Sequence, residues 1–121
     1  MLRMNWPTDV EGEVIFLPTE AGGRKGPAFS GYRPQFFYDS QDWDAIQFYP
    51  DVQQANPGDT VRTYFAFLSP QMHVGKIVAG KMFLIREGSR VVGYGRITKV
   101  IDLEKSAKRA LDREKPLDPS V

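Results

Sequence analysis

The sequence predicts an all-β fold, a six-stranded antiparallel closed β-barrel of Greek-key type with a short C-terminal helix. Six short segments rich in β-branched and aromatic residues recur with turn residues between them, and no helical pattern separates them. With 121 residues the chain has room for one core. We divide it into an N-terminal lead at 1–11, a barrel domain at 12–101, and a short helix with a flexible tail at 102–121.

Local residue types place the strands in order along the chain. The first strand runs from Glu13 to Leu17 and ends at Pro18, after which the glycine-rich segment 21–31 reads as a surface loop. Asn, Pro, Gly and Asp at 56–59 are the residue types of a tight turn. We expect the remaining strands at 35–38, 43–48, 60–69, 82–86 and 91–101.

Alternation of side chains along these strands predicts the core. The strand at 60–69 alternates, and both of its faces are partly apolar, as expected of a barrel wall that a neighbour covers on its outside. Gly93 and Gly95 fall on one face of the last strand, where they would permit a bulge or a sharp corner. The core is expected to contain Val14, Phe16, Phe36, Ile46, Val61, Phe65, Phe67, Leu84 and Val100.

The end of the chain has a different pattern. Apolar residues at helical spacing between Leu103 and Leu111 predict a short helix over 102–115, with Asp102 as its N-cap and Pro116 as its stop. The apolar face is thin, so we expect the helix to lie on the barrel or to fray. Residues 116–121 are expected to be disordered.

Composition excludes several classes of protein. Cysteine is absent, which excludes disulfides and thiolate metal sites, and no leader or membrane-spanning segment is evident, so we expect a cytoplasmic protein without a membrane role. The net charge of +1 hides an uneven distribution of charged residues along the chain. The segment 22–34 contains three basic residues and no acidic one, whereas the segment 39–59 contains five aspartates and no basic residue. These charges could also be ordinary solvated strand faces.

Catalysis, metal binding and nucleotide binding find little support. His73 is the only histidine and is expected to be a solvated loop residue without a catalytic role. The segment from Gly75 to Met82 matches a phosphate-binding loop except at its last position, which lacks the magnesium-binding hydroxyl, and no helix is predicted after it. We therefore expect no enzyme activity, no cofactor, no metal and no nucleotide, with the loop exposing two lysines.

The basic loop and the strand after it carry the candidate binding residues. Arg24, Lys25 and Arg33 suit phosphate contacts, Tyr32 could stack on a base or bond a sugar, and Gln35 could reach a 2′-hydroxyl. The alternative is structural: Tyr32 and Phe36 would belong to the core, and the arginines would pair with the aspartates at 39–59. Spacing alone does not separate the two readings.

Three blocks of the sequence resemble the C-terminal domain of elongation factor Tu. They are GGRKGPAFSGYRPQFFY, PGDTVRTYFAFLSP and FLIREGSRVVGYGRITKVI, in the order and near the spacing of that family, and the resemblance covers about 12–101. It implies a six-stranded antiparallel barrel. It also implies that the domain packs against a GTPase domain and contributes to binding the T-stem of aminoacyl-tRNA and the exchange factor.

Several positions depart from the family. Lys25 and Gly26 stand where the family usually has histidine and threonine, Ala45 falls at a threonine position used near tRNA, and the aspartates that follow would repel a phosphate backbone. The loop from Met72 to Lys81 is longer than in the family, and a helical segment follows Ile101, where the family normally ends.

Two functions therefore remain open. The first is a protein-interaction module related to translation, with a translation GTPase or another translation factor as its partner. The alternative is a tRNA- or RNA-binding accessory domain. Either would use residues from one candidate set: Arg24, Lys25, Tyr32, Arg33, Gln35, Arg86 and Arg90.

Overall fold

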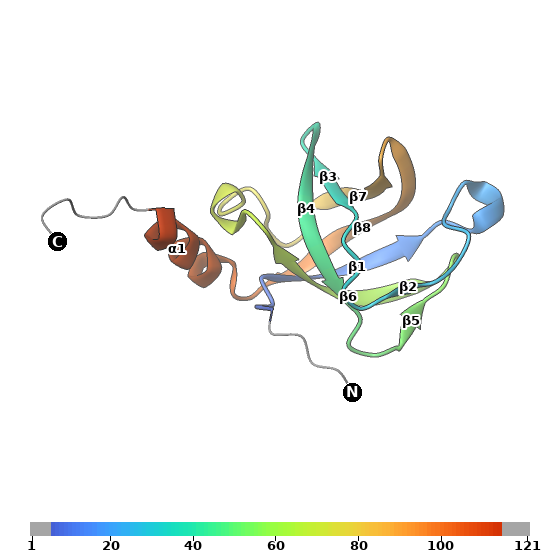
Figure 1. Ribbon diagram of the computed structural model, residues 1–121, viewed down its shortest axis with the longest axis horizontal. Helices are drawn as coiled ribbons and strands as arrows, with labels where there is room; N and C mark the ends of the chain where they lie inside the picture. The colour runs from blue at the N-terminus through green and yellow to red at the C-terminus, as the bar shows by residue number, and fades with distance from the viewer. Residues whose placement is uncertain (1–5, 115–121) are drawn as a thin grey trace, which may run out of the picture.

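The computed structural model describes residues 6–114, and the predicted tail at 116–121 lies outside this range (Figure 1). The longer strands, in chain order, are β1 (Val10–Phe16), β3 (Gln35–Tyr38), β4 (Gln41–Phe48), β6 (Thr60–Phe67), β7 (Met82–Glu87) and β8 (Arg90–Val100). Two short strands, β2 (Ala28–Phe29) and β5 (Gln54–Ala55), two 3-10 turns, η1 (Thr19–Ala21) and η2 (Pro70–Met72), and one helix, α1 (Leu103–Glu114), complete the described part.

The six longer strands form a closed antiparallel barrel in the order β1-β6-β4-β3-β7-β8, which confirms the predicted fold. The strands β3, β4 and β6 follow one another as antiparallel neighbours, and β1 lies beside β6 rather than beside β3, which is Greek-key order. Closure comes from pairing of β8 with both β7 and β1. The pairing of β2 with β5 was not predicted, because two-residue strands leave no alternation in the sequence.

Aromatic rings fill the barrel. The Phe36 ring stacks on Phe83 with centroids 4.4 Å apart, and it meets the edges of Phe65 and Phe67 at 5.3 and 5.1 Å. All four residues are buried, and burial of each such side chain contributes on the order of 2 kcal/mol to folding.

Two predicted core positions are wrong. Leu84 is only half-buried and Val100 is 40% exposed. The run from Met82 to Ile85 is apolar at every position, so the sequence does not say which residues face inward. A register shift opposite Glu11 and Gly12 inserts an extra residue before Val100 and pairs Val100 with the buried Val10, but Val100 is the last residue of β8 and is only partly covered there.

The two glycines of β8 allow close approach of β1. A Cβ atom at Gly95 would lie 2.0 Å from the carbonyl oxygen of Glu13, and one at Gly93 would lie 3.0 Å from that of Ile15. A bulge also interrupts the β7–β8 ladder between Ile85 and Arg86, next to Gly93. The glycines therefore serve the strand contact and the bulge that their spacing predicted.

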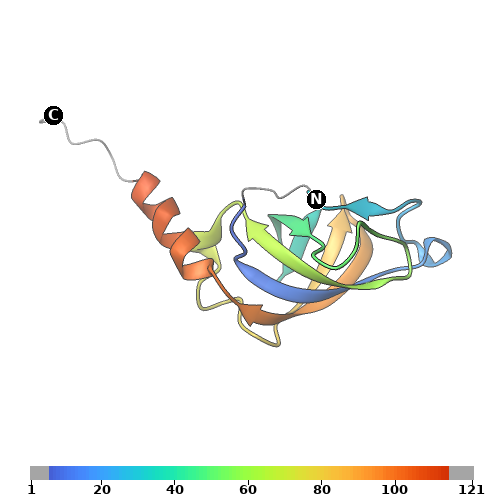
Figure 2. The same cartoon turned by 90° about the horizontal axis from the view of Figure 1, so that it is seen from below.

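One end of the barrel bears a lobe made of the connection 70–81 and helix α1. Figures 1 and 2 show α1 projecting from the barrel beside η2. Ile77 and Leu103, each 1% exposed, belong to the barrel core, and the Gln71 amide donates to Glu114 at 2.8 Å. The long loop and the helical extension therefore pack on each other, and the described helix does not stand apart from the fold.

A buried carboxylate joins this lobe to the barrel. Asp9 is fully buried, and it accepts hydrogen bonds from the Phe67 amide at 2.8 Å and from the Ser106 hydroxyl at 2.5 Å. Its backbone carbonyl also accepts the Ile101 amide at 2.9 Å. Burial raises the pKa of Asp9 despite the hydrogen bonds that favour its charged form. Asp9 thus ties β1, β6 and α1 together.

Candidate functional site

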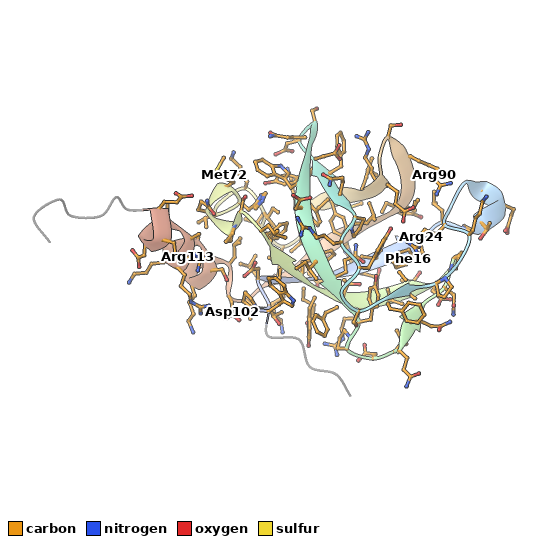
Figure 3. All side chains as sticks on the ribbon, viewed as in Figure 1. Phe16, Arg24, Met72, Arg90, Asp102 and Arg113 are labelled. Carbon is orange, nitrogen blue, oxygen red and sulfur yellow. The ribbon has the colours of Figure 1, made fainter. Side chains whose placement is uncertain are left out.

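Glu87 organises the largest group of candidate residues. It stands at the end of β7, and its Oε2 accepts hydrogen bonds from Arg24 Nη1 at 2.6 Å and from the Tyr32 hydroxyl at 2.5 Å. The Arg24 guanidinium lies over the Tyr32 ring at 4.5 Å, and Arg90 reaches Glu87 Oε1 at 3.4 Å. Figure 3 shows Arg24 and Arg90 at the same end of the barrel, away from α1.

Arg24 stabilises the local structure of the basic loop. Its Nε and Nη2 donate to the carbonyl oxygens of Gly26 and Pro27, so the guanidinium also fixes the fold of the basic loop. Burial alone would raise the pKa of Glu87, but the Tyr32 hydrogen bond and the charge of Arg24 outweigh burial and lower it. The charge of Arg24 is therefore neutralised inside the protein.

Two further candidates meet at Asp44. The Gln35 amide donates to Asp44 Oδ1 at 3.0 Å, and Arg33 lies 3.7 Å from Oδ2. Gln35 and Asp44 are cross-strand partners of β3 and β4, so the barrel register sets this contact. About half of the Arg33 side chain is exposed, at 50%, so this longer ion pair leaves the arginine accessible.

The remaining two candidates, Arg86 and Lys25, belong to neither of these groups. Arg86 on β7 reaches Asp42 at 3.7 Å and lies over the Phe37 ring at 4.6 Å. Lys25 is exposed and has no ion pair with another described residue. The structural alternative considered for the loop arginines therefore describes Arg33, whereas Arg24 pairs with a glutamate outside the aspartate run.

Glu87 was not among the predicted site residues, although it joins three of them. It is separated from Arg24 by 63 positions in the sequence, and nothing local marks it as a partner. Its place next to the Gly88 turn between β7 and β8 was the one available signal.

The prediction of a solvated His73 is wrong. The residue is fully buried among the rings of Tyr38, Trp43 and Phe67, and its Nδ1 lies 2.5 Å from the Tyr38 hydroxyl. Burial lowers the pKa of His73 to about 4, with a smaller contribution from the Lys76 charge. The connection 70–81 folds back over the barrel end, which a single polar residue in a loop sequence does not reveal.

The segment resembling a phosphate-binding loop has another structure. It leads into strand β7 and not into a helix, so it lacks the helix N-terminus that would meet phosphates. Lys76 is exposed, but Lys81 is not free as expected, because it pairs with Asp39 at 2.7 Å and lies over the Tyr38 ring. Among residues 6–114 no group of His, Asp and Glu side chains is arranged to hold a metal ion.

Comparison with known families decides the relationship. Residues 4–101 match the family model described as Elongation factor Tu C-terminal domain. The chain belongs to this family. The match occupies most of the 121-residue sequence, and the C-terminal domain of elongation factor Tu is a non-catalytic domain that does not include the GTPase domain. Helix α1 lies beyond the matched residues.

Within the elongation factor Tu C-terminal domain fold, the candidate residues come from the first and last parts of the matched region. The barrel brings Arg24, Tyr32 and Arg90 to Glu87, and it brings Arg33 and Gln35 to a separate acidic residue. Among residues 6–114 no helix is both long enough and apolar enough to cross a membrane.

Proposed function

We propose that this chain is a non-catalytic protein-interaction module of translation, which docks its partner on the outer face of β3, β7 and β8. On this face Phe37, Leu84 and Tyr94 stand directly opposite one another on three adjacent strands. With Met82, which is 60% exposed, they line a shallow hollow of about 290 Å³. This accessible apolar row is the observation that supports the proposal, since aromatic residues and Met are enriched in protein interfaces.

The charges around this row also favour a protein partner. Arg24 is neutralised by Glu87, and Arg86 has both a carboxylate and an aromatic ring as neighbours. A surface built to hold a phosphate backbone would keep such cations available for phosphate oxygens. Arginine beside an aromatic row suits the core of a protein interface better.

The partner that fits the family relationship is a translation GTPase or another translation factor, and the module would act in the cytoplasm. The division of the chain at 1–11, 12–101 and 102–121 remains part of this proposal. We expect no nucleotide or cofactor to bind, because the segment from Gly75 to Met82 lacks both the magnesium hydroxyl and the following helix.

RNA binding is the second candidate, and three accessible cations favour it. Lys25 has no ion pair among the described residues, and Arg33 and Arg90 are 50% and 51% exposed with longer ion pairs. Arg33 and Arg90 could exchange a carboxylate for a phosphate, and Lys25 could bind a phosphate without giving up a partner among the described residues. In that case the affinity for tRNA would fall steeply with salt, and each replaced arginine would reduce the slope by a little under one unit.

A binding experiment with matched variants separates the two functions. The purified chain is used to capture translation GTPases from an extract, and Met82→Asp is compared with Leu111→Asp, which alters another exposed apolar side chain, on α1. We expect Met82→Asp to lose capture and Leu111→Asp to keep it. Equal capture by the two variants would refute the proposed face. Sub-micromolar tRNA affinity at about 0.15 M salt that Arg33→Ala abolishes would establish the RNA function instead.

A further inference from the structure

A second apolar surface lies away from the face proposed above. It is a groove of about 980 Å³, bounded by the segment 6–8 on one side and the connection 50–53 on the other, with Tyr64 and Ala66 of β6 between them. Most of its lining is aromatic or proline. Trp6 and Val52 at its walls are 47% and 43% exposed, so nothing in the described residues covers the groove. Concave apolar surfaces of this size are the usual form of a binding site.

The chemistry of the lining suits an extended proline-rich segment. Grooves walled by aromatic rings bind polyproline II helices, whose backbone carbonyls have no internal partner and accept bonds from the groove. Trp6 and Tyr64 offer such donors. The indole N–H of Trp6 bonds to no other described residue, and the Tyr64 hydroxyl accepts from Arg62 Nη1 at 3.1 Å, which leaves its own proton available.

The rim of the groove favours a cation in the ligand. Asp51 is the one charged residue that lines it, and Asp51 pairs with Arg62 at 2.8 Å. Arg62 also reaches Glu11, which does not line the groove, at 3.4 Å, so two carboxylates share one guanidinium and the three side chains together have a net charge of −1 next to the groove. Complementary charge next to the aromatic walls would orient a bound segment.

The chain itself contains a segment of this chemistry. Beyond the described residues the sequence continues Lys115, Pro116, Leu117, Asp118, Pro119, which places a cation before two prolines that stand three residues apart. We propose that this tail of one copy of the chain binds in the groove of a second copy. Lys115 would meet the acidic rim at Asp51, and the two prolines would pack between the aromatic walls.

The arrangement of α1 favours a second copy over the same chain. Helix α1 begins beside the groove, where the Asp102 amide donates to the Thr8 carbonyl at 3.0 Å, and it leads away from the barrel (Figures 1 and 2). Its 12 residues extend about 18 Å, so Lys115 of the same chain starts too far from Asp51 to meet it. The seven residues 115–121 span at most about 25 Å when fully extended. A contact between a tail and a groove joins different surfaces, so two copies can exchange tails or several can form a chain.

Sedimentation over a wide concentration range tests this proposal. A short segment in an open groove should bind weakly, so we expect self-association of the full chain at about 0.1 mM. The double variant Pro116→Ala with Pro119→Ala, and the groove variant Val52→Lys, should each weaken it at least about tenfold. Val74→Lys is the matched control, because Val74 is also 43% exposed but lies outside the groove, and it should associate like the parent chain.

A peptide titration locates the contact. A peptide of residues 113–121 is added to the double proline variant, and the indole signal of Trp6 is followed by NMR. We expect a saturable shift that a peptide with both prolines changed to alanine does not cause. A monomeric chain at all concentrations, with no shift on adding peptide, would overturn the proposal. A Trp6 signal that differs between the full chain and the double variant without self-association would place the tail in its own groove, which also overturns the second-copy contact.

Discussion

His73 makes the stability of the fold depend on pH. The neutral ring is fully buried among Tyr38, Trp43 and Phe67, and its Nε2 has no hydrogen-bond partner in the part of the chain that the structure describes. A protonated ring there would carry a buried charge beside aromatic side chains without a carboxylate to pair with. The folded protein therefore resists protonation of this side chain, whereas the unfolded chain does not.

The magnitude follows from the two pKa values. The folded pKa of His73 is about 4, and the unfolded value is about 6.5. Because the unfolded chain binds the proton more tightly, the contribution to stability is complete above about pH 6.5 and is lost as the pH falls toward 4. The full loss is about 3 kcal/mol, of which about 2 kcal/mol has occurred at about pH 5.

Urea unfolding at about pH 7.5 and about pH 5 measures this loss, with His73→Phe as the reference. Phenylalanine keeps the packing against Trp43 and Phe67 but does not titrate. The parent chain should lose about 2 kcal/mol more than the variant between the two conditions. The raised pKa of Asp9 acts in the opposite direction, and it cancels because both proteins contain it. Equal losses in the two proteins, or titration of His73 near pH 6.5 by NMR, would refute the reasoning.

Two further substitutions test the close contact of Gly95 with β1 and the hydrogen bonds of the buried Asp9. Gly95→Ala would bring a Cβ to 2.0 Å from the Glu13 carbonyl oxygen and should lower the free energy of unfolding in urea by more than about 3 kcal/mol. In the control Gly26→Ala the new Cβ meets nothing within 4 Å, so the free energy of unfolding should change by less than about 0.5 kcal/mol. Similar losses of stability in the two variants would contradict the close contact of β8 with β1. Asp9→Ala leaves the buried Phe67 amide without its acceptor and should cost about 2 to 4 kcal/mol, more than Asp9→Asn. Hydrogen exchange should show that α1 loses protection first in Asp9→Ala. Unchanged protection of α1 would contradict the role of Asp9 in holding the helix to the barrel.

The sequence alone determined the barrel. Successive side chains of a strand point to opposite faces, so alternating residues at 60–69 identify a strand without knowledge of its neighbours. Turn residue types indicate the local backbone conformation, as at Gly58, which has a φ of 91°. These are local properties, and for that reason the buried Phe65 and the approximate positions of the six longer strands could be read directly, although β1 begins at Val10 and not at Glu13 as predicted.

The residue types of the candidate site could be read from the sequence, but their partners could not. Arg24 stood out as a cation in a glycine-rich loop, yet its charge is neutralised by Glu87, which is 63 positions away. The sequence also does not show which side chains of β7 point into the barrel, since four consecutive apolar residues at 82–85 fit either face of a strand.

Only the tertiary structure decided which residues the lobe buries. Asp9 meets Ser106 across 97 positions, and His73 meets Tyr38 across 35, so neither contact exists until the barrel closes and α1 packs beside the connection 70–81. A polar side chain in a loop sequence is expected in water unless distant segments fold over it. Here the closing of one barrel end by residues far apart in the sequence turned a loop histidine and an N-terminal aspartate into buried groups that link the added helix to the core.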